Sequence, residues 1–367
     1  MSQVLASASP VEPPLGADPV ALTLWLCQVP SPIGEEHALC EALLARSEGW
    51  GVVAPTVRVA ESFAVALSRG TGGPRVTLAG HLDVVRTAHD GPPRIEGDKL
   101  YGAGSADMKS GLALMIAAAE DRALRERCDL TLIFYSREEG PFAENELGPL
   151  LAQHPELAAT DLAVCLEPSY SKLQLGCVGS LHAKVTVRGR TAHSARPWEG
   201  ENAIHRAWPL LRDLDARKPI EATIDGMLYR AVMSATLGTG GRGRNIVPDA
   251  FELNVNHRFL PGVTVEQAEA DLRALVDGRA DIEVFDRSPS ALPFRTHPLV
   301  GKLVEAGVPT VEPKQAWTDV ARFATLGVPA VNWGPGDQAQ AHQRNEFTSV
   351  SGLHQGLAIL QRFLRSV

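Results

Sequence analysis

Short apolar runs alternate with helical stretches through the first half of the chain, and this alternation restricts the possible fold more than any other feature. Residues 76–79, 130–135 and 162–166 have the length and composition of buried strands. Residues 110–119 form an apolar run of small residues with helical character, and residues 19–48 also have a helical pattern. Strands that alternate with helices form a largely parallel sheet covered on both faces. We therefore expect an α/β domain.

The pattern changes near Gly179. The following elements are expected in the order β-α-β-β-α-β, at residues 181–187, 202–214, 229–237, 251–259, 265–276 and 281–285. This is the order of a ferredoxin-like α+β sandwich. After Pro293 the first pattern returns, and it ends in an amphipathic helix over 350–364. We therefore predict a loosely ordered leader over 1–18, one α/β domain over 19–178 and 292–367, and an inserted α+β domain over 179–291.

Composition excludes several classes of protein. The five cysteines are odd in number and include no Cys-x-x-Cys pair, which argues against a disulfide framework and against a thiolate zinc site. A reducing, cytoplasmic location is expected. The formal charge of −8 disfavours nucleic acid and anionic membranes as partners. No apolar run is long enough to cross a bilayer. A small anionic substrate is still compatible with these observations.

Two adjacent carboxylates, Glu138 and Glu139, follow the apolar run that ends at Tyr135. Side by side at the end of a buried strand, they repel each other and lose hydration. A bound cation between them, or a division into one base and one metal ligand, offsets this cost. The alternative is a solvated acidic turn, which is the commoner role of a Glu-Glu pair. The pair alone does not decide between these interpretations.

Other histidines and carboxylates occupy equivalent positions, just after a strand or in a glycine-rich turn. They are His81 with Asp83, Asp107, Glu167 and His342. In a doubly wound sheet the carboxyl ends of the strands converge on one crevice. Histidine and carboxylate ligands without thiolates suit zinc or a similar divalent ion. The sequence therefore predicts a metal centre at these strand ends.

Each of these residues also has an ordinary structural interpretation. Asp107 precedes a helix and has the position of an N-cap, whereas Glu167 precedes Pro168 in a turn. His342 lies in a loop, where most histidines only face solvent. His81 and Asp83 are two apart, so both point the same way in a strand, and Asp83 can orient the His81 ring. The order of all these residues along the chain is what favours the metal centre.

The same motifs resemble the co-catalytic zinc aminoacylase and carboxypeptidase family, over nearly the whole chain after the leader. Within the family the likeness is closest to the enzymes that hydrolyse N-succinyl-LL-2,6-diaminopimelate. The motifs are Gly80-His81-Leu82-Asp83, the stretch 101–111, Glu138-Glu139, Leu166-Glu167-Pro168, 189–196, 200–204, 244–249, 256–259, 318–323 and 332–342. The resemblance implies a dimeric amidohydrolase with two zinc ions per subunit, for which cobalt is a possible substitute.

The resemblance also implies a role for each residue of the centre. One zinc ion would take His81 and Glu167, and the second would take Glu139 and His342. Asp107 would bridge the two ions. Glu138 would be the general base that takes a proton from the attacking water and delivers it to the leaving amine. Asp83 would complete the catalytic set beside His81.

The inserted domain would act as a lid and as the dimerisation domain. The resemblance implies that His193 reaches the active site of the other subunit and stabilises the oxyanion there. Arg258 and Asn245 would contact the substrate carboxylate and backbone. Thr318, Gly334 and Pro335 lie at positions where the family lines its pocket.

The sequence departs from the family pattern at two places. Val84-Val85-Arg86 replaces the usual Thr-Val-Pro, and residues 61–65 lack the usual Asn. Neither departure involves a predicted ligand. The expected reaction forms succinate and LL-2,6-diaminopimelate, in lysine and diaminopimelate biosynthesis. A related deacylase of the acetylornithine deacetylase type and a dipeptidase are the alternatives. A non-catalytic binding protein would have no need of Glu138. A dinucleotide-dependent dehydrogenase would need a Gly-x-Gly-x-x-Gly after the first strand, which the sequence lacks.

Overall fold

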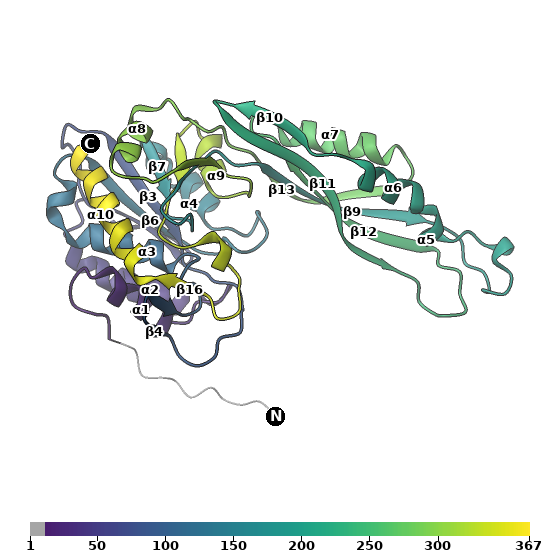
Figure 1. The fold of residues 1–367 in the computed structure, drawn as a ribbon, viewed down its shortest axis with the longest axis horizontal. Helices are drawn as coiled ribbons and strands as arrows, with labels where there is room; N and C mark the ends of the chain where they lie inside the picture. Colours follow the sequence, from purple (N-terminus) through teal and green to yellow (C-terminus); the bar gives the residue numbers. More distant parts are fainter. Residues whose placement is uncertain (1–11) are drawn as a thin grey trace. The chain divides into compact units, whose positions relative to one another are not determined.

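The chain folds into two compact units, shown in a computed structural model that describes residues 12–367 (Figure 1). Residues 1–11 of the expected leader lie outside the described residues. Unit 1 comprises Met1–Gln174, Thr296–Val311 and Val331–Val367. Unit 2 comprises Leu175–Arg295 and Glu312–Ala330. Each unit has its own sheet and its own buried core.

An eight-stranded sheet forms the centre of unit 1, with the strand order β1-β2-β6-β3-β7-β15-β8-β14. Strand β3 pairs in parallel with β6 and with β7, whereas β2 pairs with β1 and β6 in the antiparallel sense. The strands are β1 (Val57–Val59), β2 (Ser62–Ala66), β3 (Arg75–His81), β6 (Asp129–Tyr135), β7 (Leu162–Cys165), β8 (Leu173–Leu175), β14 (Val311–Pro313) and β15 (Ala330–Asn332). The parallel centre therefore has its carboxyl ends at one edge.

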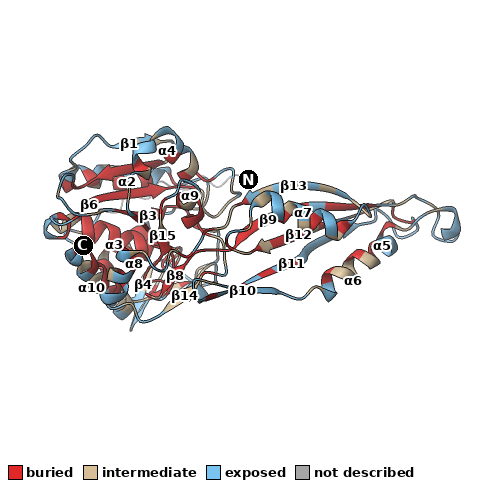
Figure 2. Cartoon of the chain, turned by 90° about the horizontal axis from the view of Figure 1, so that it is seen from above, coloured by how far each residue is buried: buried red, intermediate tan, exposed pale blue. Residues whose placement is uncertain are grey.

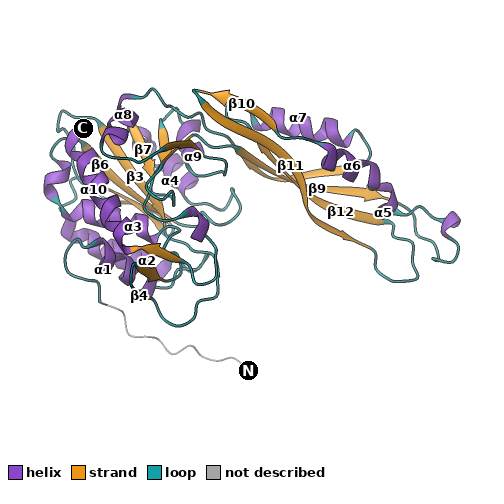
Figure 3. Ribbon diagram, in the orientation of Figure 1, coloured by secondary structure: helices purple, strands orange, loops and turns teal. Residues whose placement is uncertain are grey.

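Helices cover both faces of this sheet, as Figure 3 shows. Helices α1, α3, α8 and α10 pack as one layer, and α2 and α4 pack near β1 and β2. Their bounds are α1 (Pro19–Gln28), α2 (His37–Ser47), α3 (Lys109–Glu120), α4 (Leu147–Gln153), α8 (Pro298–Glu305) and α10 (Val350–Ser366). The helix predicted over 19–48 is thus two helices, because prolines at 30 and 32 cannot continue a helical hydrogen-bond ladder.

Burial follows the predicted apolar runs (Figure 2). Every residue of β6 after Asp129 is buried, and so is every residue of α3 from Lys109 to Ala119. A strand buried on both faces reads as a continuous apolar run, as β6 does. No helix within residues 12–367 is both long and apolar enough to cross a bilayer.

Unit 2 has a five-stranded antiparallel sheet with the order β10-β11-β12-β9-β13. Its elements are β9 (Gly179–Arg188), α5 (Ala203–Arg206), α6 (Trp208–Ala216), β10 (Ile220–Ile224), β11 (Met227–Gly240), β12 (Ala250–Phe259), α7 (Val265–Val276), β13 (Asp281–Ser288) and α9 (Val320–Thr325). Without β10 the order is that of the ferredoxin-like sandwich. Strand β10 was not predicted, since its burial pattern is mostly exposed.

The core of unit 2 lies between one face of the sheet and its helices. Leu181, Leu253, Leu210 and Leu272 are buried together there. Strand β11 alternates between buried and exposed residues over its first half and is exposed over its second half. This is the period of a strand with one covered face.

Smaller elements complete the chain. A three-stranded sheet in unit 1 has the order β16-β5-β4. It joins two strands near residue 100 to one strand near residue 348. Its strands are β4 (Arg94–Glu96), β5 (Lys99–Tyr101) and β16 (Phe347–Ser349). Short 3₁₀ turns occur at η1 (Glu48–Trp50), η2 (Arg122–Arg125), η3 (Pro155–Ala158), η4 (Pro197–Glu199) and η5 (Gln338–Gln340). The pairing of β16 with β5 matters for the site described next.

Candidate metal centre

Three neighbouring strands of unit 1 end beside the predicted ligands. His81 is the last residue of β3 and pairs in register with Tyr135, the last residue of β6. Glu138 and Glu139 follow β6 by a short turn, and Glu167 follows β7 by two residues. Because these strands are parallel neighbours, their carboxyl ends lie side by side. The sheet therefore brings the three predicted strand-end sites together.

The other two ligand candidates come from loops. Asp107 lies just before α3, and His342 lies beyond η5 in the last third of the chain. The loop that leads to His342 passes close to the loop of Asp107, because a Cβ on Gly336 would lie only 2.1 Å from the main-chain oxygen of Ala106. Glycine at 336 therefore permits this approach, and a side chain there would separate the two loops.

Asp107 is shared by two groups of potential ligands. One group contains His81, Asp107 and Glu167, and the other contains Asp107, Glu139 and His342, with ligand atoms within 4.8 Å of one another in each group. Oδ1 of Asp107 is 3.2 Å from Nε2 of His81, and Oδ2 is 3.7 Å from Nε2 of His342. The two carboxylate oxygens thus face different histidines, which is the arrangement a bridging carboxylate needs.

A hydrogen bond fixes the ring of His81. Its Nδ1 lies 2.9 Å from the main-chain oxygen of Asp83. A carbonyl oxygen only accepts, so Nδ1 donates, and in the neutral ring the lone pair is on Nε2. Nε2 faces Asp107. The ring is therefore oriented as a metal-binding histidine requires.

The ionisable groups of the centre shift one another's proton affinities. Burial lowers the pKa of His81, but its hydrogen bond with Asp107 and the charges of Asp83 and Glu138 raise that pKa well above its ordinary value. The hydrogen bond with Glu139 raises the pKa of His342 to about 9. Burial raises the pKa of Glu139. Carboxylates are thus in excess here, which favours the binding of cations.

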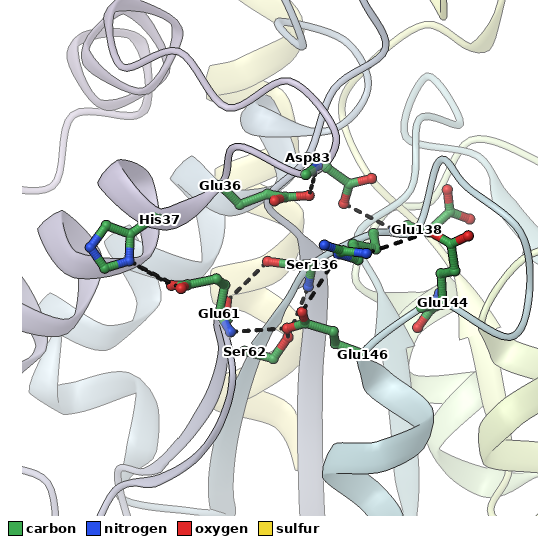
Figure 4. Close-up of polar contacts among 12 residues, drawn as sticks. Glu36, His37, Glu61, Ser62, Asp83, Ser136, Glu138, Glu144 and Glu146 are labelled. Carbon is green, nitrogen blue, oxygen red and sulfur yellow. Dashed lines mark hydrogen bonds and ion pairs between the residues drawn. The ribbon is translucent and has the colours of Figure 1, made fainter.

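Asp83 has a different contact from the one predicted. Its carboxylate lies 3.7 Å from Nδ1 of His81, beyond hydrogen-bond distance, and the main-chain oxygen makes the bond to the ring instead. The carboxylate accepts a hydrogen bond from the main-chain N–H of Glu138 at 3.0 Å (Figure 4). It accepts a second one from the main-chain N–H of Glu139 at 2.9 Å. Asp83 is fully buried. It therefore fixes the backbone of the glutamate pair as well as the end of β3.

The turn before the glutamate pair is also tied to the neighbouring strand (Figure 4). Ser136 donates its hydroxyl to the main-chain oxygen of Glu61 at 3.0 Å, and Ser62 donates its hydroxyl to Glu146 at 2.7 Å. Arg137 has a φ of 63°, in the left-handed region that non-glycine residues seldom adopt. Such conformations persist where the surrounding structure imposes them, often at functional sites.

A further cluster of potential ligands, His37, Glu41 and Glu61, has a simpler explanation. Arg58 forms ion pairs with Glu41 at 2.7 Å and with Glu61 at 3.1 Å. His37 is largely exposed and hydrogen bonds to Glu61. The arginine already balances these carboxylates, so this surface cluster gives no reason to expect a cation.

Two of the predicted substrate residues lie together in unit 2. His193 forms an isolated β-bridge with Ile246, and the N–H of Ser194 donates to the main-chain oxygen of Asn245 at 2.9 Å. His193 and Asn245 are both exposed. Nδ1 of His193 accepts from the N–H of Ala195 at 3.1 Å. The proton of the neutral ring is therefore on Nε2, which is left as a donor.

Arg258 lies at the other end of the same pair of strands. It is opposite Ser180 in the register of β12 with β9, whereas His193 follows the far end of β9. Its Nε donates to Asn256 at 3.0 Å. Among the described residues, no carboxylate forms an ion pair with it, and burial lowers its pKa. The structure does not bring Arg258 and His193 together within unit 2.

The remaining predicted substrate residues are buried. Thr318 belongs to unit 2, and its hydroxyl has no hydrogen-bond partner among the described residues. Gly334 belongs to unit 1, where an added Cβ would lie 2.4 Å from the main-chain oxygen of Leu166 and 2.5 Å from that of Glu167. Pro335 follows it in the same buried turn. Glycine at 334 is thus required by the backbone that carries Glu167, a predicted ligand.

Sequence reasoning missed Glu346, a buried carboxylate beside the Asp107 loop. It accepts three backbone hydrogen bonds from that loop, and burial raises its pKa to about 7. Lys109, also missed, is a buried lysine whose Nζ donates to the main-chain oxygen of Val29 at 2.9 Å. A lone Glu four residues after a histidine has no distinctive pattern in the sequence, so no local signal could have identified it.

The donor set fits a centre of two divalent ions. It offers two imidazoles and three carboxylates, one of them shared, and no thiolate. All five cysteines are buried, and none of them forms a disulfide. Histidine with carboxylate oxygen suits zinc and related ions, and a shared carboxylate is typical of paired metals.

Known proteins with this fold and sequence pattern are numerous. A curated protein of Mycobacterium tuberculosis, which carries a desuccinylase name, is 38% identical over 355 residues, or 95% of this chain and 99% of its own. The succinyl-diaminopimelate desuccinylase of Corynebacterium glutamicum is 37% identical over 356 residues, covering 95% of this chain and 96% of its own. Both alignments span nearly the full length of each protein.

Solved structures support the fold at lower identity. A tripeptidase from Staphylococcus aureus superposes with a TM-score of 0.79 at 19% identity, covering 95% of this chain and 97% of its own. A metallo-carboxypeptidase from Sulfolobus solfataricus superposes with a TM-score of 0.77 at 15% identity, covering 95% and 98%. The predicted fold class is therefore confirmed. Residues 77–366 match the peptidase family M20/M25/M40, and the chain belongs to that family.

Proposed function

We propose that this protein hydrolyses N-succinyl-LL-2,6-diaminopimelate to succinate and LL-2,6-diaminopimelate, as a metal-dependent amidohydrolase. The observation that carries the proposal is the position of Asp107, whose two carboxylate oxygens face His81 and His342 in two overlapping ligand groups. Such a pair of sites suits hydrolysis of an amide. The desuccinylase name of the Corynebacterium glutamicum relative supports the substrate.

His81 and Glu167 would hold one zinc ion, Glu139 and His342 the second, and Asp107 both, with cobalt as a possible substitute. When bound, the metals would polarise the acyl carbonyl and lower the pKa of a water molecule. The chain contributes the ligand geometry. His81 is fixed by Asp83, and Glu139 is fixed through its own backbone N–H. These contacts hold the ligands in place before any metal binds.

Glu138 is the proposed general base. Its backbone is fixed by the Asp83 carboxylate, and its own carboxylate lies with His81 and Glu139 in a third group of potential ligand atoms, which does not include Asp107. Adjacent residues in a turn direct their side chains differently, so one carboxylate can bind metal while the other accepts a proton. Glu138 would take the proton from the attacking water and deliver it to the leaving amine nitrogen.

His193 is the proposed oxyanion donor. Its Nδ1 accepts a hydrogen bond from Ala195, so Nε2 carries the proton and faces away from its own backbone. An N–H donor aimed at the developing negative charge stabilises the transition state of acyl transfer. This role requires an N–H at Nε2, which the Ala195 contact favours.

Arg258 is the proposed partner of a substrate carboxylate. A half-buried guanidinium with an amide neighbour and no ion pair among the described residues retains donors for an anion. His193 lies beyond the other end of β9, at least eight residues away along the strand. That is roughly 25 Å at the rise of a β-strand. One substrate molecule cannot reach both residues of a single unit 2.

The separation of Arg258 and His193 supports a homodimer in which each active site takes residues from both subunits. Under this proposal, His193 and Asn245 contribute to the active site of the partner subunit. Arg258 contributes to a different active site. Unit 2 also exposes large apolar side chains, among them Trp198, Trp208 and Leu237. Apolar surface of this kind is typical of an interface. Unit 2 would thus be both the lid and the dimerisation domain, and it includes Glu312–Ala330 in addition to the predicted insert over 179–291.

The biosynthesis of lysine and diaminopimelate is the proposed setting. Five free, buried cysteines support a reducing compartment, the cytoplasm. The substrate is a small anionic N-acyl amino acid. Nucleic acid and membranes are not proposed as partners.

A turnover assay tests the substrate. The zinc-loaded protein is given succinyl-diaminopimelate, acetylornithine and a dipeptide in parallel, and kcat/KM is compared. We expect the succinylated compound to be hydrolysed with the highest kcat/KM by at least tenfold. A higher kcat/KM for acetylornithine or for the dipeptide would show that the substrate is wrongly assigned. The protein would still be an amidohydrolase.

A further inference from the structure

The carboxylate of Glu346 faces three backbone N–H groups of the Asp107 loop. Oε1 accepts from the N–H of Ala106 at 2.7 Å and from that of Asp107 at 2.8 Å, and Oε2 accepts from the N–H of Gly104 at 2.9 Å. The side chain is buried, with 2% of its surface exposed. A buried carboxylate is costly unless its lone pairs are satisfied, and here the backbone satisfies them.

These contacts determine where Asp107 can point. The N–H of Asp107 is one of the three donors, so the backbone of the shared ligand is itself held. The N–H of Gly102 also donates to the main-chain oxygen of Glu346 at 3.2 Å. Next to it, Phe347 of β16 pairs with Tyr101 of β5. Glu346 and Phe347 therefore hold the Asp107 loop at two places, at residues 101–102 and at residues 104–107.

The same short segment carries His342. Glu346 follows His342 by four residues, and Nε2 of His342 is 2.9 Å from Glu139. His342 and Asn345 have φ values of 61° and 55°, so this segment has a defined, left-handed backbone at two places. A displacement of Glu346 would therefore move both the Asp107 loop and the His342 segment.

The two ligand groups depend on these segments unequally. The group of Asp107, Glu139 and His342 takes two members from segments that Glu346 holds. The group of His81, Asp107 and Glu167 takes only Asp107 from them. His81 is the last residue of strand β3 and Glu167 follows strand β7, so the central sheet places both of them.

We propose that Glu346 is a positioning residue for the paired metal centre, on which the Glu139–His342 position depends more strongly than the His81–Glu167 position. The proposal rests on the proposed function only in requiring that both positions bind metal. Groups that orient metal ligands without touching the metal typically contribute about 10- to 100-fold to affinity. Glu346→Gln replaces one accepting oxygen by an NH₂ group, which cannot accept from a backbone N–H.

Asp98 provides the matched control. Its carboxylate also joins distant parts of unit 1, accepting from the hydroxyl of Ser349 at 2.7 Å and from the N–H of Ser351 at 2.8 Å. It is exposed and does not contact the Asp107 loop among the described residues. Asp98→Asn therefore removes a comparable tether from the same region and leaves the ligands in place.

The experiment is a zinc titration of the full-length, chelator-stripped protein by calorimetry, with bound metal counted after desalting. Wild type and Asp98→Asn are expected to bind two zinc ions per subunit. Glu346→Gln is expected to bind the first with affinity within threefold of wild type, and the second at least tenfold more weakly, so that the desalted protein retains about one ion. Circular dichroism of the metal-free proteins monitors folding.

Two outcomes would overturn the proposal: two ions bound by Glu346→Gln with wild-type affinity, or equal weakening of both positions. If metal-free Glu346→Gln is unfolded, Glu346→Asp keeps the charge with a shorter side chain and must show the same unequal weakening. The titration uses no substrate. A wild type that binds two ions but leaves succinyl-diaminopimelate intact would contradict the proposed function and not the role of Glu346.

Discussion

The ligand cluster of unit 1 and the predicted substrate residues of unit 2 differ in how completely one chain assembles them. In unit 1, residues from three strand ends and two loops meet in overlapping groups whose ligand atoms lie within 4.8 Å of one another. In unit 2, His193 and Asn245 lie on exposed loops, and Arg258 is at the opposite end of the strand pair. The candidate ligands are therefore assembled within one unit, whereas the predicted substrate residues of unit 2 lie at two places far apart on it.

The pKa shifts of particular histidines also differ between the two regions. In unit 1 the hydrogen bond with Glu139 raises the pKa of His342 to about 9. In unit 2 burial lowers the pKa of His182 and of His257. Unit 1 concentrates carboxylates that attract cations, whereas burial in unit 2 disfavours the charged form of these histidines. This contrast predicts different responses of the two units to mutation and to pH.

The largest expected effect separates catalysis from metal binding within unit 1. Glu138→Gln removes the proposed base, so we expect kcat to fall by about 10²- to 10⁴-fold. Bound metal should stay at two ions per subunit, because neither ligand group that shares Asp107 includes Glu138. Steady-state kinetics and metal analysis of the same preparation measure both quantities.

Glu144→Gln is the control for this variant, since Glu144 is exposed in the same loop (Figure 4). Its kcat should stay within twofold of wild type. Loss of one metal ion from Glu138→Gln would show that Glu138 is a ligand and that the roles of the two glutamates are wrongly assigned.

A smaller effect is expected in unit 2. His193→Ala removes an oxyanion donor, which typically lowers kcat by about 10²- to 10³-fold, with little change in KM. His205→Ala, a substitution of another exposed histidine in unit 2, should leave kcat unchanged. Steady-state kinetics of the purified proteins give these values.

Hybrid dimers then test whether His193 serves the partner. A His193→Ala subunit mixed with a His81→Ala subunit can form one intact site, from His81 of the first subunit and His193 of the second. We expect activity to return after subunit exchange, verified by mass spectrometry. If exchange occurs and activity stays absent, His193 acts in its own chain or has no catalytic role.

The independence of the two cores gives a third prediction. Leu181 is fully buried in the core of unit 2, so Leu181→Ala should lower the free energy of unfolding by about 2–5 kcal/mol. Leu228→Ala, at an exposed position on β11, should change it by less than about 0.5 kcal/mol. Urea unfolding followed by circular dichroism measures both. Two bound zinc ions are expected in each variant, and metal loss from Leu181→Ala would contradict a self-contained centre.

The smallest effect concerns pH. His257 is buried and donates from Nδ1 to the main-chain oxygen of Ala268, and burial lowers its pKa. The unfolded chain therefore binds a proton more readily than the folded one, so stability is fully present above about pH 6.5 and falls as the pH decreases below that value. Hydrogen exchange, corrected for intrinsic rates, should show lower protection in β9 and β12 at pH 5.5 than at pH 7.5.

His257→Gln cannot titrate, and its protection should vary less over the same pH range. Amides of β3 and β6 in unit 1 serve as the internal reference. Equal losses in both units, or no loss in β9 and β12, would show that the buried histidines of unit 2 do not set this dependence.

The sequence predicted those elements in which buried apolar residues recur with a clear period along the chain. Helix α7 was predicted over 265–276 and has these bounds, and β6 differs from its prediction by one residue. Strand β10 and the three-stranded sheet were missed, because their residues are mostly exposed or the strands have only three residues. Pairing with a partner far away in sequence stabilises such strands, and a local pattern does not record that pairing.

By itself, the sequence determined the fold class and the chemical types at the strand ends, because apolar period and turn position are local properties. Only the tertiary structure decided which atoms meet. It assigned the Asp83 carboxylate to the backbone of the glutamate pair, and it placed Glu346 against the loop of Asp107, 239 positions away in the chain. It also separated Arg258 from His193 by the length of a strand. These contacts depend on sheet register and loop crossing, which follow from packing of the whole chain.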